Sequence, residues 1–376
     1  MGIRMSEFIL FSESSPNVGG QELQLMQQMA KLGEAGYRPV LACRPGTAVA
    51  DVARDKGLAI LPLRFRNSAH LPTIVGLWRW MREHRPRLAV CHSGHDSNNV
   101  ALAARMLRDR PFLLRSRTYQ AGYPSTLTYN HLIDATMLPS ECLRQTLLAN
   151  TAIRAERLHV VYPGIDFERL DQAAGQSLPP RIADWLSGGT GPVLAHAAML
   201  RGEKGHLTLL GALAELKDAW PGLRYVIAGD GGERARIEAE VSRLGLQDRV
   251  LLAGIVNPVA ALLARADIVV MPSTYEPLGM SQIEALGLGI PVIASDTGGI
   301  PETVSDGVTG LLAAPGSVSD WARALAEALA DLPRMRAMAE VGREDVRQRF
   351  SVERNLESIL QLAGLPRWPR RLQGFE

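Results

Sequence analysis

Short apolar runs alternate with longer segments of mixed polarity along most of the chain. In the first half, six of these runs have the length and composition typical of buried strands, and each is separated from the next by enough chain for a helix. They are Phe8–Phe11, Pro39–Ala42, Ala59–Leu63, Leu88–Cys91, Phe112–Leu114 and Ala135–Leu138. Repeated strand–helix–strand units predict a parallel sheet with helices on both faces.

The same alternation begins again near residue 193 and predicts a second unit of the same kind. Its predicted strands are Val193–His196, Tyr225–Ala228, Val250–Ala253, Ile268–Met271, Pro291–Ala294 and Gly310–Ala313. After these strands the pattern is helical from about Ser317 to Leu362, with a division at Pro333. We therefore expect an α/β fold with two Rossmann-like, doubly wound parallel sheets.

A change of composition marks the boundary between the two units. The chain has 376 residues, which is more than one hydrophobic core usually serves. Pro163 and Gly164 follow the first set of strands and precede a polar stretch, as is typical of a linker. We expect an N-terminal domain over residues 1–165, a second domain over 166–350, and a C-terminal helix over 351–376 that crosses back to the first domain.

The composition, 46% hydrophobic and 21% charged, is typical of a globular protein. The net charge of +2 conceals two unequal halves: residues 1–162 contain 20 Lys and Arg against 12 Asp and Glu, whereas residues 163–376 contain 21 against 27. The basic half suits either an anionic acceptor or an anionic membrane surface, although codon bias would produce the same counts. The sequence has no basic and aromatic module of a nucleic-acid-binding protein, so we expect no nucleic-acid partner.

Cys43, Cys91 and Cys142 are an odd number of cysteines without metal-type spacing, which predicts reduced thiols rather than disulfides or a zinc site. No apolar run approaches the length of a membrane span, so we expect a cytoplasmic protein. The stretch Trp78–Arg85 has the composition of a helix at a membrane interface, and equally that of a helix packing its Trp side chains on the sheet. The first interpretation would add a peripheral contact with the cytoplasmic face of the inner membrane.

The most informative stretch for chemistry is Ser273–Val292, which is interpreted as a strand end, a turn with a carboxylate, and a helix starting near Gly279. The free N–H groups of the turn and helix start would face one crevice and could bind a phosphate or a sugar hydroxyl. Glu276 could contact the bound group, and Glu284 could reach a ribose diol. Two Glu eight residues apart arise often by chance, but Gly279 and the small residues that follow make this pattern more specific.

Arg201 and Lys204 lie in a Gly-containing loop directly after the predicted strand Val193–His196. A planar Arg fork and a Lys point charge are suited to a metal-free pyrophosphate site. Two exposed cations in an ordinary loop would have the same sequence, so these residues alone do not decide the function.

Gly-rich turns follow two of the predicted strands. Gly19 and Gly20 would permit close approach of a ligand at the start of the first helix. The stretch Ala228–Glu233 contains Gly229 and begins like the dinucleotide fingerprint, but Arg234 replaces its last glycine. The missing fingerprint disfavours a nicotinamide-dependent oxidoreductase.

Taken in order, these motifs resemble the retaining glycosyltransferases of family 4 (glycosyl transferases group 1). Enzymes of this family have the GT-B fold, in which two Rossmann-like domains face a central cleft. The run Arg115–Thr118 further resembles bacterial enzymes that act on lipopolysaccharide and other envelope saccharides. The motifs that carry the resemblance span nearly the whole chain: the loop at residues 19–20, Tyr162–Asp166, Arg201 with Lys204 and Gly205, Gly229–Gly232, Gly254–Pro258, Glu276 with Glu284, and Thr297–Glu302.

The resemblance implies transfer of a sugar from a nucleotide diphosphate donor, preferably a UDP-sugar, to a saccharide or lipid-linked acceptor. Neither a metal ion nor another cofactor is expected, and the anomeric configuration would be retained. The N-terminal domain would bind the acceptor and the second domain the donor. The implied catalytic residues are Arg201, Lys204 and Glu276, and the implied donor-binding residues are Gly19, Gly20, Arg201, Lys204, Gly229, Ile255, Glu276, Leu278, Gly279, Met280 and Glu284.

Candidate acceptor residues follow the fourth and fifth predicted strands. Family members often carry a His after the fifth strand, where Arg117 or Thr118 stands here. His92 and His95 could contact an acceptor, or could simply belong to the polar start of a helix near Asp96. An anionic acceptor or donor phosphate could be bound by Arg115 or Arg117. The candidate acceptor residues are therefore His92, His95, Arg115, Arg117 and Thr118.

Two other functions fit the same fold. One is a UDP-sugar 2-epimerase, which would convert its UDP-sugar without an acceptor. The other is a catalytically silent nucleotide-sugar-binding protein, against which the presence of Arg201, Lys204, Glu276 and Glu284 argues.

Overall fold

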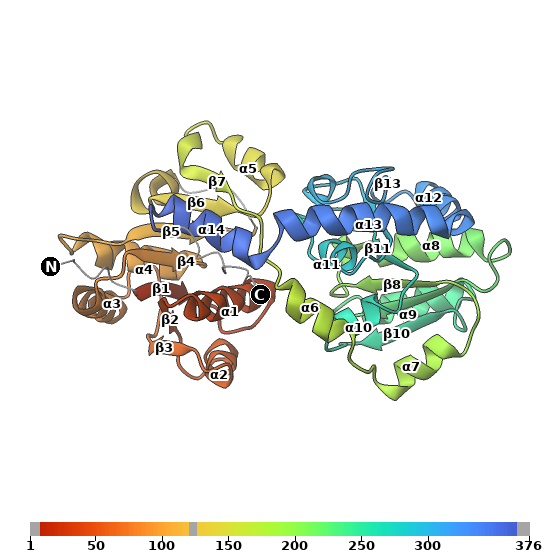
Figure 1. The fold of residues 1–376 in the computed structure, drawn as a ribbon, viewed down its shortest axis with the longest axis horizontal. Coiled ribbons are helices and arrows are strands. Elements are labelled where there is room, and N and C mark those ends of the chain that lie inside the picture. The colour runs from red at the N-terminus through yellow and green to blue at the C-terminus, as the bar shows by residue number, and fades with distance from the viewer. Residues whose placement is uncertain (1–7, 120–125, 367–376) are drawn as a thin grey trace, which may run out of the picture. The chain divides into compact units, whose positions relative to one another are not determined.

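The computed structural model describes residues 8–119 and 126–366 (Figure 1). The chain divides into two compact units, residues 1–164 with 351–376, and residues 165–350. All twelve predicted strands are present, with ends shifted by at most two residues. The fold class, two Rossmann-like parallel-sheet units, is confirmed. Which unit binds donor and which binds acceptor stays a prediction.

The first unit contains a seven-stranded parallel sheet in the order β3-β2-β1-β4-β5-β6-β7. Its strands are β1 (Phe8–Glu13), β2 (Arg38–Cys43), β3 (Ala59–Pro62), β4 (Leu88–Cys91), β5 (Phe112–Ser116), β6 (Ala135–Leu138) and β7 (Leu158–Val160). Its helices are α1 (Gly20–Glu34), α2 (Ala48–Asp55), α3 (Leu71–His84), α4 (Gly94–Arg105), α5 (Glu141–Leu148) and α14 (Val352–Leu362), with the short turns η1 (Thr128–Leu132) and η2 (Ala155–Arg157). The sequence analysis missed β7, because three residues are too few for a periodic pattern.

Two apolar cores lie on opposite faces of this sheet. Successive side chains of a strand point to opposite faces, so Ile9 and Phe11 of β1 pack with α1, α2 and α14, whereas Leu10 packs with α3 and α4. The buried strands are apolar on both faces, which is the reason that they read as continuous runs rather than alternating ones.

The long helical segment at the end of the chain forms three helices, α12 (Val318–Ala330), α13 (Leu332–Arg349) and α14. The predicted division at Pro333 falls two residues earlier, because the Asp331 side chain caps α13 at 3.0 Å from the Arg334 N–H. A second break, at Phe350 and Ser351, separates α13 from α14, and the C-terminal helix expected from residue 351 begins at Val352.

The helix α14 packs within the first unit (Figure 1). The Gln28 side-chain amide on α1 donates to Asn355 Oδ1 at 2.8 Å, and Asn355 Nδ2 donates to the Tyr162 carbonyl at 2.6 Å. These two hydrogen bonds orient α14 on the first unit, beside the apolar packing of Leu356 and Ile359.

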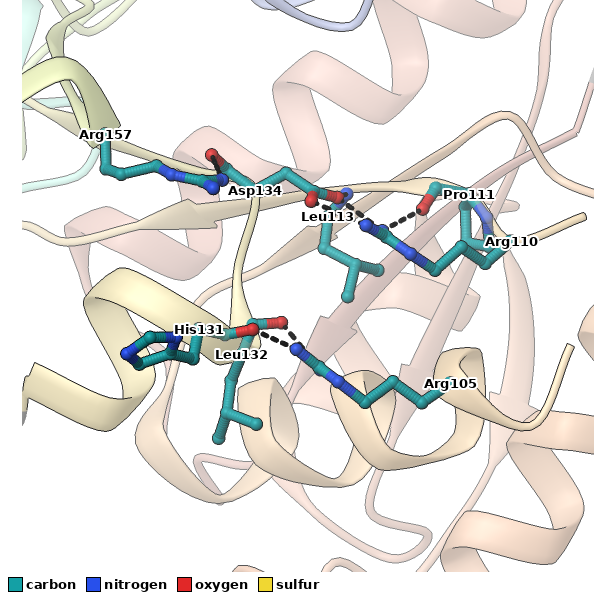
Figure 2. A network of polar contacts seen from close by, with 8 residues as sticks. All are labelled: Arg105, Arg110, Pro111, Leu113, His131, Leu132, Asp134 and Arg157. Carbon is teal, nitrogen blue, oxygen red and sulfur yellow. Dashed lines mark hydrogen bonds and ion pairs between the residues drawn. The ribbon is translucent and has the colours of Figure 1, made fainter.

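A polar network joins α4 and the beginnings of β5 and β6 in the first unit (Figure 2). Arg110 donates to both oxygens of Asp134 at 2.5 and 2.8 Å, and the Leu113 N–H donates to one of them at 2.9 Å. Burial raises the pKa of Asp134, but the hydrogen bonds from Arg110 and Leu113 outweigh burial and the net shift is downward. Arg105 and Arg157 donate to nearby carbonyl oxygens, so these three arginines have structural roles.

The second unit contains a six-stranded parallel sheet in the order β10-β9-β8-β11-β12-β13. Its strands are β8 (Val193–Ala197), β9 (Arg224–Ala228), β10 (Val250–Gly254), β11 (Ile268–Met271), β12 (Val292–Ser295) and β13 (Leu311–Ala313). Its helices are α6 (Phe167–Ala174), α7 (Pro180–Ser187), α8 (His206–Leu216), α9 (Arg234–Arg243), α10 (Val259–Leu263), α11 (Ser281–Gly287), α12 and α13, with the turns η3 (Gly202–Lys204) and η4 (Ile300–Glu302).

Each sheet has one point at which the strand order reverses, between β1 and β4 in the first unit and between β8 and β11 in the second. The loops at the carboxyl ends of these strand pairs diverge to opposite faces of the sheet, and open α/β sheets bind ligands in the resulting crevice. The β1 and β4 loops and the β8 and β11 loops are therefore the places to look for function.

Candidate active site

The loops after β8 and β11 are joined at the reversal point of the second sheet. The Thr274 N–H donates to the Glu203 carbonyl at 2.8 Å, and the Ser281 hydroxyl donates to the Ala197 carbonyl at 2.8 Å. These contacts hold the two loops together, and so they fix the side chains of one loop relative to those of the other.

Lys204 and Glu276 form an ion pair across these two loops. Their side chains are only 20% and 13% exposed. Gly205 follows Lys204 in the left-handed region, with φ of 70°, and an added Cβ there would lie 1.8 Å from the Pro272 carbonyl oxygen. Only glycine permits this approach, which holds Lys204 opposite the β11 loop.

Arg201 lies apart from this pair. Its side chain is 57% exposed, and its nearest charged partner is Glu203, at 3.9 Å. Arg201 lines a cavity of about 210 Å³ together with Arg236 and Thr274. The structure thus brings Lys204 and Glu276 together and leaves the Arg201 guanidinium available to a ligand.

Behind the β8 loop lies a pair of buried histidines that the sequence analysis missed. The rings of His196 and His206 are 4.4 Å apart, and Tyr225 Oη lies 2.9 Å from His196 Nδ1. Burial lowers the pKa of His196, and it lowers that of His206 to about 4. His206 Nε2 is 3.4 Å from the Met199 carbonyl, so a neutral His206 supports the β8 loop from beneath.

Glu284 is the fourth residue of α11, which begins at Ser281 rather than near Gly279 as predicted. The left-handed Gly279, with φ of 84°, still belongs to the turn before the helix, and this is why the helix starts later. Burial raises the pKa of Glu284 to about 7. No side-chain hydrogen bond or ion pair to Glu284 is found among the described residues, so its carboxyl group is available to hydroxyl groups of a ligand.

The other predicted donor residues of the second unit lie along the same edge. Leu278 is buried and Met280 is partly exposed, and the Leu278 carbonyl already accepts from Gln282 at 2.7 Å. An added Cβ at Gly229 would lie 1.9 Å from the Ala198 carbonyl oxygen, so this glycine is required by loop packing even without a ligand. Ile255 is 82% exposed in the loop after β10. An apolar side chain so exposed at a ligand-binding edge can pack against a flat aromatic base.

In the first unit, Gly19 is the N-cap of α1, and its N–H donates to Glu22 Oε2 at 2.7 Å. That donor is therefore already used by the protein. An added Cβ at Gly20 would meet nothing within 4 Å, so packing does not require glycine at this position.

His92 and His95 lie in different environments at the reversal point of the first sheet. His92 is buried, its Nδ1 is 3.1 Å from the Ser12 carbonyl, and burial lowers its pKa. His95 is exposed. The helix α4 begins at Gly94, two residues before the position expected from Asp96. Asp96 is buried instead, and accepts hydrogen bonds from the Ser12 hydroxyl at 2.6 Å and the His92 N–H at 3.0 Å.

Glu13, at the carboxyl end of β1, was also missed by the sequence analysis. Its carboxylate accepts hydrogen bonds from the Ser93 hydroxyl, the Ser15 N–H at 2.7 Å and Gln21 Nε2 at 2.9 Å. The Gln21 amide oxygen accepts from Thr118 Oγ1 at 2.9 Å. A carboxylate that ends the first strand is the only signal in the sequence that could have identified this network.

The predicted acceptor residues at the ends of β4 and β5 differ in how far they are exposed. His92 and Thr118 line the same small cavity. Arg115 is buried, with its guanidinium 5.2 Å from the centre of the Tyr129 ring, because β5 continues to Ser116 and turns this side chain inward. Arg117 is partly exposed. The structure thus offers Thr118 and Arg117, rather than Arg115, to a ligand at this edge.

Two family models match the chain. The model described as Glycosyl transferases group 1 matches residues 181–345, and that described as Glycosyltransferase Family 4 matches residues 18–169. The chain belongs to this glycosyltransferase family.

Curated relatives of this glycosyltransferase act on different molecules according to their names. The 2-deoxystreptamine glucosyltransferase of Streptomyces kanamyceticus is 34% identical over 210 residues, covering 55% of this chain and 54% of the relative. The lipopolysaccharide core biosynthesis glycosyltransferase LpsE of Rhizobium meliloti is 33% identical over 171 residues, covering 46% and 49%. The D-inositol 3-phosphate glycosyltransferase of Saccharomonospora viridis is 29% identical over 297 residues, covering 75% and 66%. The chain matches about half the length of the first two relatives.

Solved structures match over nearly the whole glycosyltransferase chain. A glycosyltransferase from Rickettsia africae has a TM-score of 0.83 at 20% identity, covering 95% of this chain and 97% of that one. Anabaena Alr3699/HepE, solved in complex with UDP and glucose, has a TM-score of 0.76 at 23% identity, covering 95% and 99%. These similarities confirm the GT-B fold.

The described part of the glycosyltransferase has neither a membrane-spanning helix nor a cluster of metal ligands. Its helices include none that is both long and apolar enough to span a membrane. Its His, Cys, Asp and Glu side chains form no group of three or more that could hold a metal ion.

Proposed function

We propose that this glycosyltransferase moves a sugar from a nucleoside diphosphate donor, preferably a UDP-sugar, to a saccharide or lipid-linked acceptor of the bacterial cell envelope. The transfer retains the anomeric configuration and needs no metal ion. The observation that carries the proposal is the Lys204–Glu276 pair at the strand-order reversal of the second unit. The donor binds at this edge of the second unit, and the acceptor at the carboxyl edge of the first.

The ion pair gives each of its members a separate role once a donor binds. The diphosphate competes with Glu276 for the Lys204 ammonium, and the released carboxylate accepts hydrogen bonds from hydroxyl groups of the donor sugar. Arg201, exposed three residues before Lys204, supplies a second cation in the form of a planar fork. Glu284 binds the ribose hydroxyls, because its carboxyl group has no partner among the described residues.

In the transfer step, the bond between the anomeric carbon and the phosphate oxygen breaks, and its electron pair leaves with the nucleoside diphosphate. The acceptor oxygen forms its bond to the anomeric carbon on the same face, and the acceptor proton passes to the departing phosphate oxygen. Lys204 and Arg201 stabilise the negative charge that develops on this phosphate. The two cations thereby replace the metal ion that many phosphate-transfer sites use.

The names of relatives support the substrate classes. HepE was solved in complex with UDP and glucose, which supports a UDP-sugar donor. LpsE is named for lipopolysaccharide core biosynthesis, which supports an envelope acceptor. Synthesis of such a saccharide would place this enzyme in the cytoplasm, with its basic first unit toward the anionic inner-membrane surface.

The Lys204→Ala variant tests the catalytic assignment. Removal of one of the two cations that stabilise the leaving phosphate should reduce turnover at least about 100-fold, an effect comparable to removal of one oxyanion donor. The matched control is Lys217→Ala, because Lys217 is an exposed lysine at the far end of α8. Release of UDP or GDP in the presence of envelope-type acceptors measures turnover, and thermal unfolding verifies that both variants fold. Normal transfer rates in Lys204→Ala would contradict the proposal, as would UDP-sugar epimerisation without an acceptor.

The Glu276→Gln variant separates binding from transfer. Without the carboxylate, Lys204 is no longer engaged before the donor arrives, so UDP should bind at least as tightly as in the wild type while sugar transfer falls. Calorimetry with UDP and a transfer assay measure the two effects. Weaker UDP binding in Glu276→Gln would show that the ion pair organises the phosphate site rather than competing with it.

A further inference from the structure

Three arginines lie on two neighbouring loops at the carboxyl edge of the first sheet. Arg44 directly follows β2, and Arg64 and Arg66 lie in the loop between β3 and α3. The strands β2 and β3 are paired in parallel up to Cys43 and Pro62, and the Leu63 N–H donates to the Cys43 carbonyl at 2.9 Å. Arg44 and Arg64 therefore follow adjacent strand ends.

These three arginines have no protein partner, unlike most of the other described arginines of the first unit. Within residues 8–119 and 126–366, no hydrogen bond, ion pair or aromatic contact engages the Arg44, Arg64 or Arg66 side chain. By contrast, Arg105, Arg110 and Arg157 are used by the network at the opposite edge (Figure 2). The remaining described arginines of this unit without a partner are Arg79 on α3, and Arg85, Arg108 and Arg154, which precede β4, β5 and β7 and so lie at that opposite edge.

The loop that carries Arg64 and Arg66 is held in a strained conformation. Phe65, between them, has φ of 34°, which is rare for a residue other than glycine. Its side chain is buried in the core under α3 and α4, and its N–H donates to Thr73 Oγ1 at 3.3 Å. Burial of Phe65 leaves both flanking arginines exposed. Such strain persists only where the surrounding structure compensates for it, and it is common at ligand-binding sites.

The far end of the same loop is attached to the start of α4. Asn99, which is buried, accepts from the His70 N–H at 2.9 Å and donates to the Asn67 carbonyl at 2.7 Å. The Ser68 hydroxyl lies 2.8 Å from His95 Nδ1. The arginine-bearing loop is therefore held at both ends, and it adjoins His95, one of the candidate acceptor residues.

Carboxylates at this edge do not neutralise the three arginines. Glu13 is engaged by Ser93, Ser15 and Gln21, and Asp96 is buried. A rigid loop with uncompensated guanidinium groups is suited to an anionic group, because each guanidinium can form paired hydrogen bonds to a phosphate or carboxylate.

We propose that Arg64 and Arg66, together with Arg44, bind an anionic group of the acceptor, a phosphate ester or a carboxylate. This inference rests on the proposed function in one respect, that the first unit takes the acceptor. It specifies the acceptor as an anionic saccharide, either soluble or lipid-linked, and makes the loop between β3 and α3 the determinant of that specificity.

The test uses the full chain with its donor site occupied by UDP. Glucose 1-phosphate and glucuronate are the anionic probes, and methyl glucoside is the neutral one. The test variant is Arg64→Gln with Arg66→Gln, and the matched control is Arg79→Gln with Arg108→Gln, which removes two other exposed, unpartnered arginines. Calorimetry measures binding of each probe and, separately, of UDP.

We expect at least one anionic probe to bind the wild type and the control equally, and to bind the test variant about 10- to 100-fold more weakly, with UDP affinity unchanged. Arg64→Lys with Arg66→Lys should restore part of the affinity, because charge is kept but the planar fork is lost. Equal binding of the probes to the test variant and the wild type, or no binding of either anion to the wild type at millimolar concentration, would overturn the proposal.

Vesicles distinguish an acceptor group from a membrane surface. Phosphatidylglycerol vesicles are added to the same proteins in sedimentation assays. Loss of vesicle binding in the test variant, with probe binding retained, would assign the arginines to the membrane and overturn the proposal. A wild type that neither binds a UDP-sugar nor transfers the sugar would contradict the proposed function. The binding of the anionic probes is measured separately and could still be interpreted in that case.

Discussion

Replacement of Glu284 by Gln should make the second unit more stable, and only at high pH. The Glu284 side chain is only partly exposed, and no side-chain partner for its carboxyl group is found among the described residues. Burial therefore raises its pKa from the ordinary value of 4.5 to about 7. Gln has nearly the same shape and cannot ionise, so Glu284→Gln isolates the cost of placing a charge at this position.

The sign follows from proton binding. Between pH 4.5 and about 7, the folded protein holds the Glu284 proton while the unfolded chain has lost it, so the free energy of unfolding falls as pH rises through this range. The difference between the two pKa values corresponds to up to about 3 kcal/mol. Glu284→Gln should thus exceed the wild type by up to this amount at pH 8, and should match it near pH 4, where the carboxyl is protonated in both states.

Urea-dependent oxidation of buried methionines by hydrogen peroxide can follow the second unit alone, since oxidation reports exposure of the thioether. Met271, Met335 and Met338 are buried there, and mass spectrometry resolves their peptides. Glu344→Gln is the control, because Glu344 is an exposed glutamate on α13 of the same unit. A stability gain in Glu284→Gln that is equal at pH 4 and pH 8, or no gain at pH 8, would refute the explanation by burial.

Three further outcomes follow from the packing. Gly205→Ala should destabilise the second unit by about 2 to 4 kcal/mol in urea unfolding and should reduce transfer. The Cβ of the alanine would overlap the Pro272 carbonyl oxygen, and alanine disfavours the left-handed conformation at this position. A variant as stable as the wild type would contradict the loop geometry. Asn355→Ala should cost the first unit about 1 to 3 kcal/mol, because it leaves the buried Gln28 amide without its partner, and release of α14 should then appear in hydrogen exchange. His206→Gln should make the second unit less sensitive to acid. The pKa of His206 in the folded protein is about 4, below the ordinary 6.5, so the wild type loses up to about 3 kcal/mol of stability as pH falls from 6.5 toward 4. Thermal unfolding at several pH values measures this loss, and an unchanged acid transition in His206→Gln would argue against this cause.

Much of the fold could be predicted because parallel strands buried on both faces leave a strong local signal. The runs around Leu88–Cys91 and Ile268–Met271 were predicted with their observed ends. β7 was missed because its three residues are too few for a periodic pattern. Local periodicity thus identifies long elements well and very short ones poorly.

The candidate site was partly predictable for a different reason. Lys204, Glu276 and Glu284 were found through a family resemblance and through their positions after strands, both of which are properties of the sequence. That Lys204 pairs with Glu276, whereas Arg201 does not, depends on the contact between two loops. The burial of Arg115 likewise depends on how far β5 extends.

The sequence by itself determined the alternation of strands and helices, the two α/β units and the residue types available at each strand end. The tertiary structure decided which strand ends are neighbours. In the first sheet β4 lies beside β1, and in the second β11 lies beside β8, so residues 72 positions apart such as Lys204 and Glu276 meet, while Arg64 and Arg66 are left without a partner. The physical reason is that a periodic pattern records which face of an element is buried, whereas strand order and loop contacts arise only when all the elements share one core.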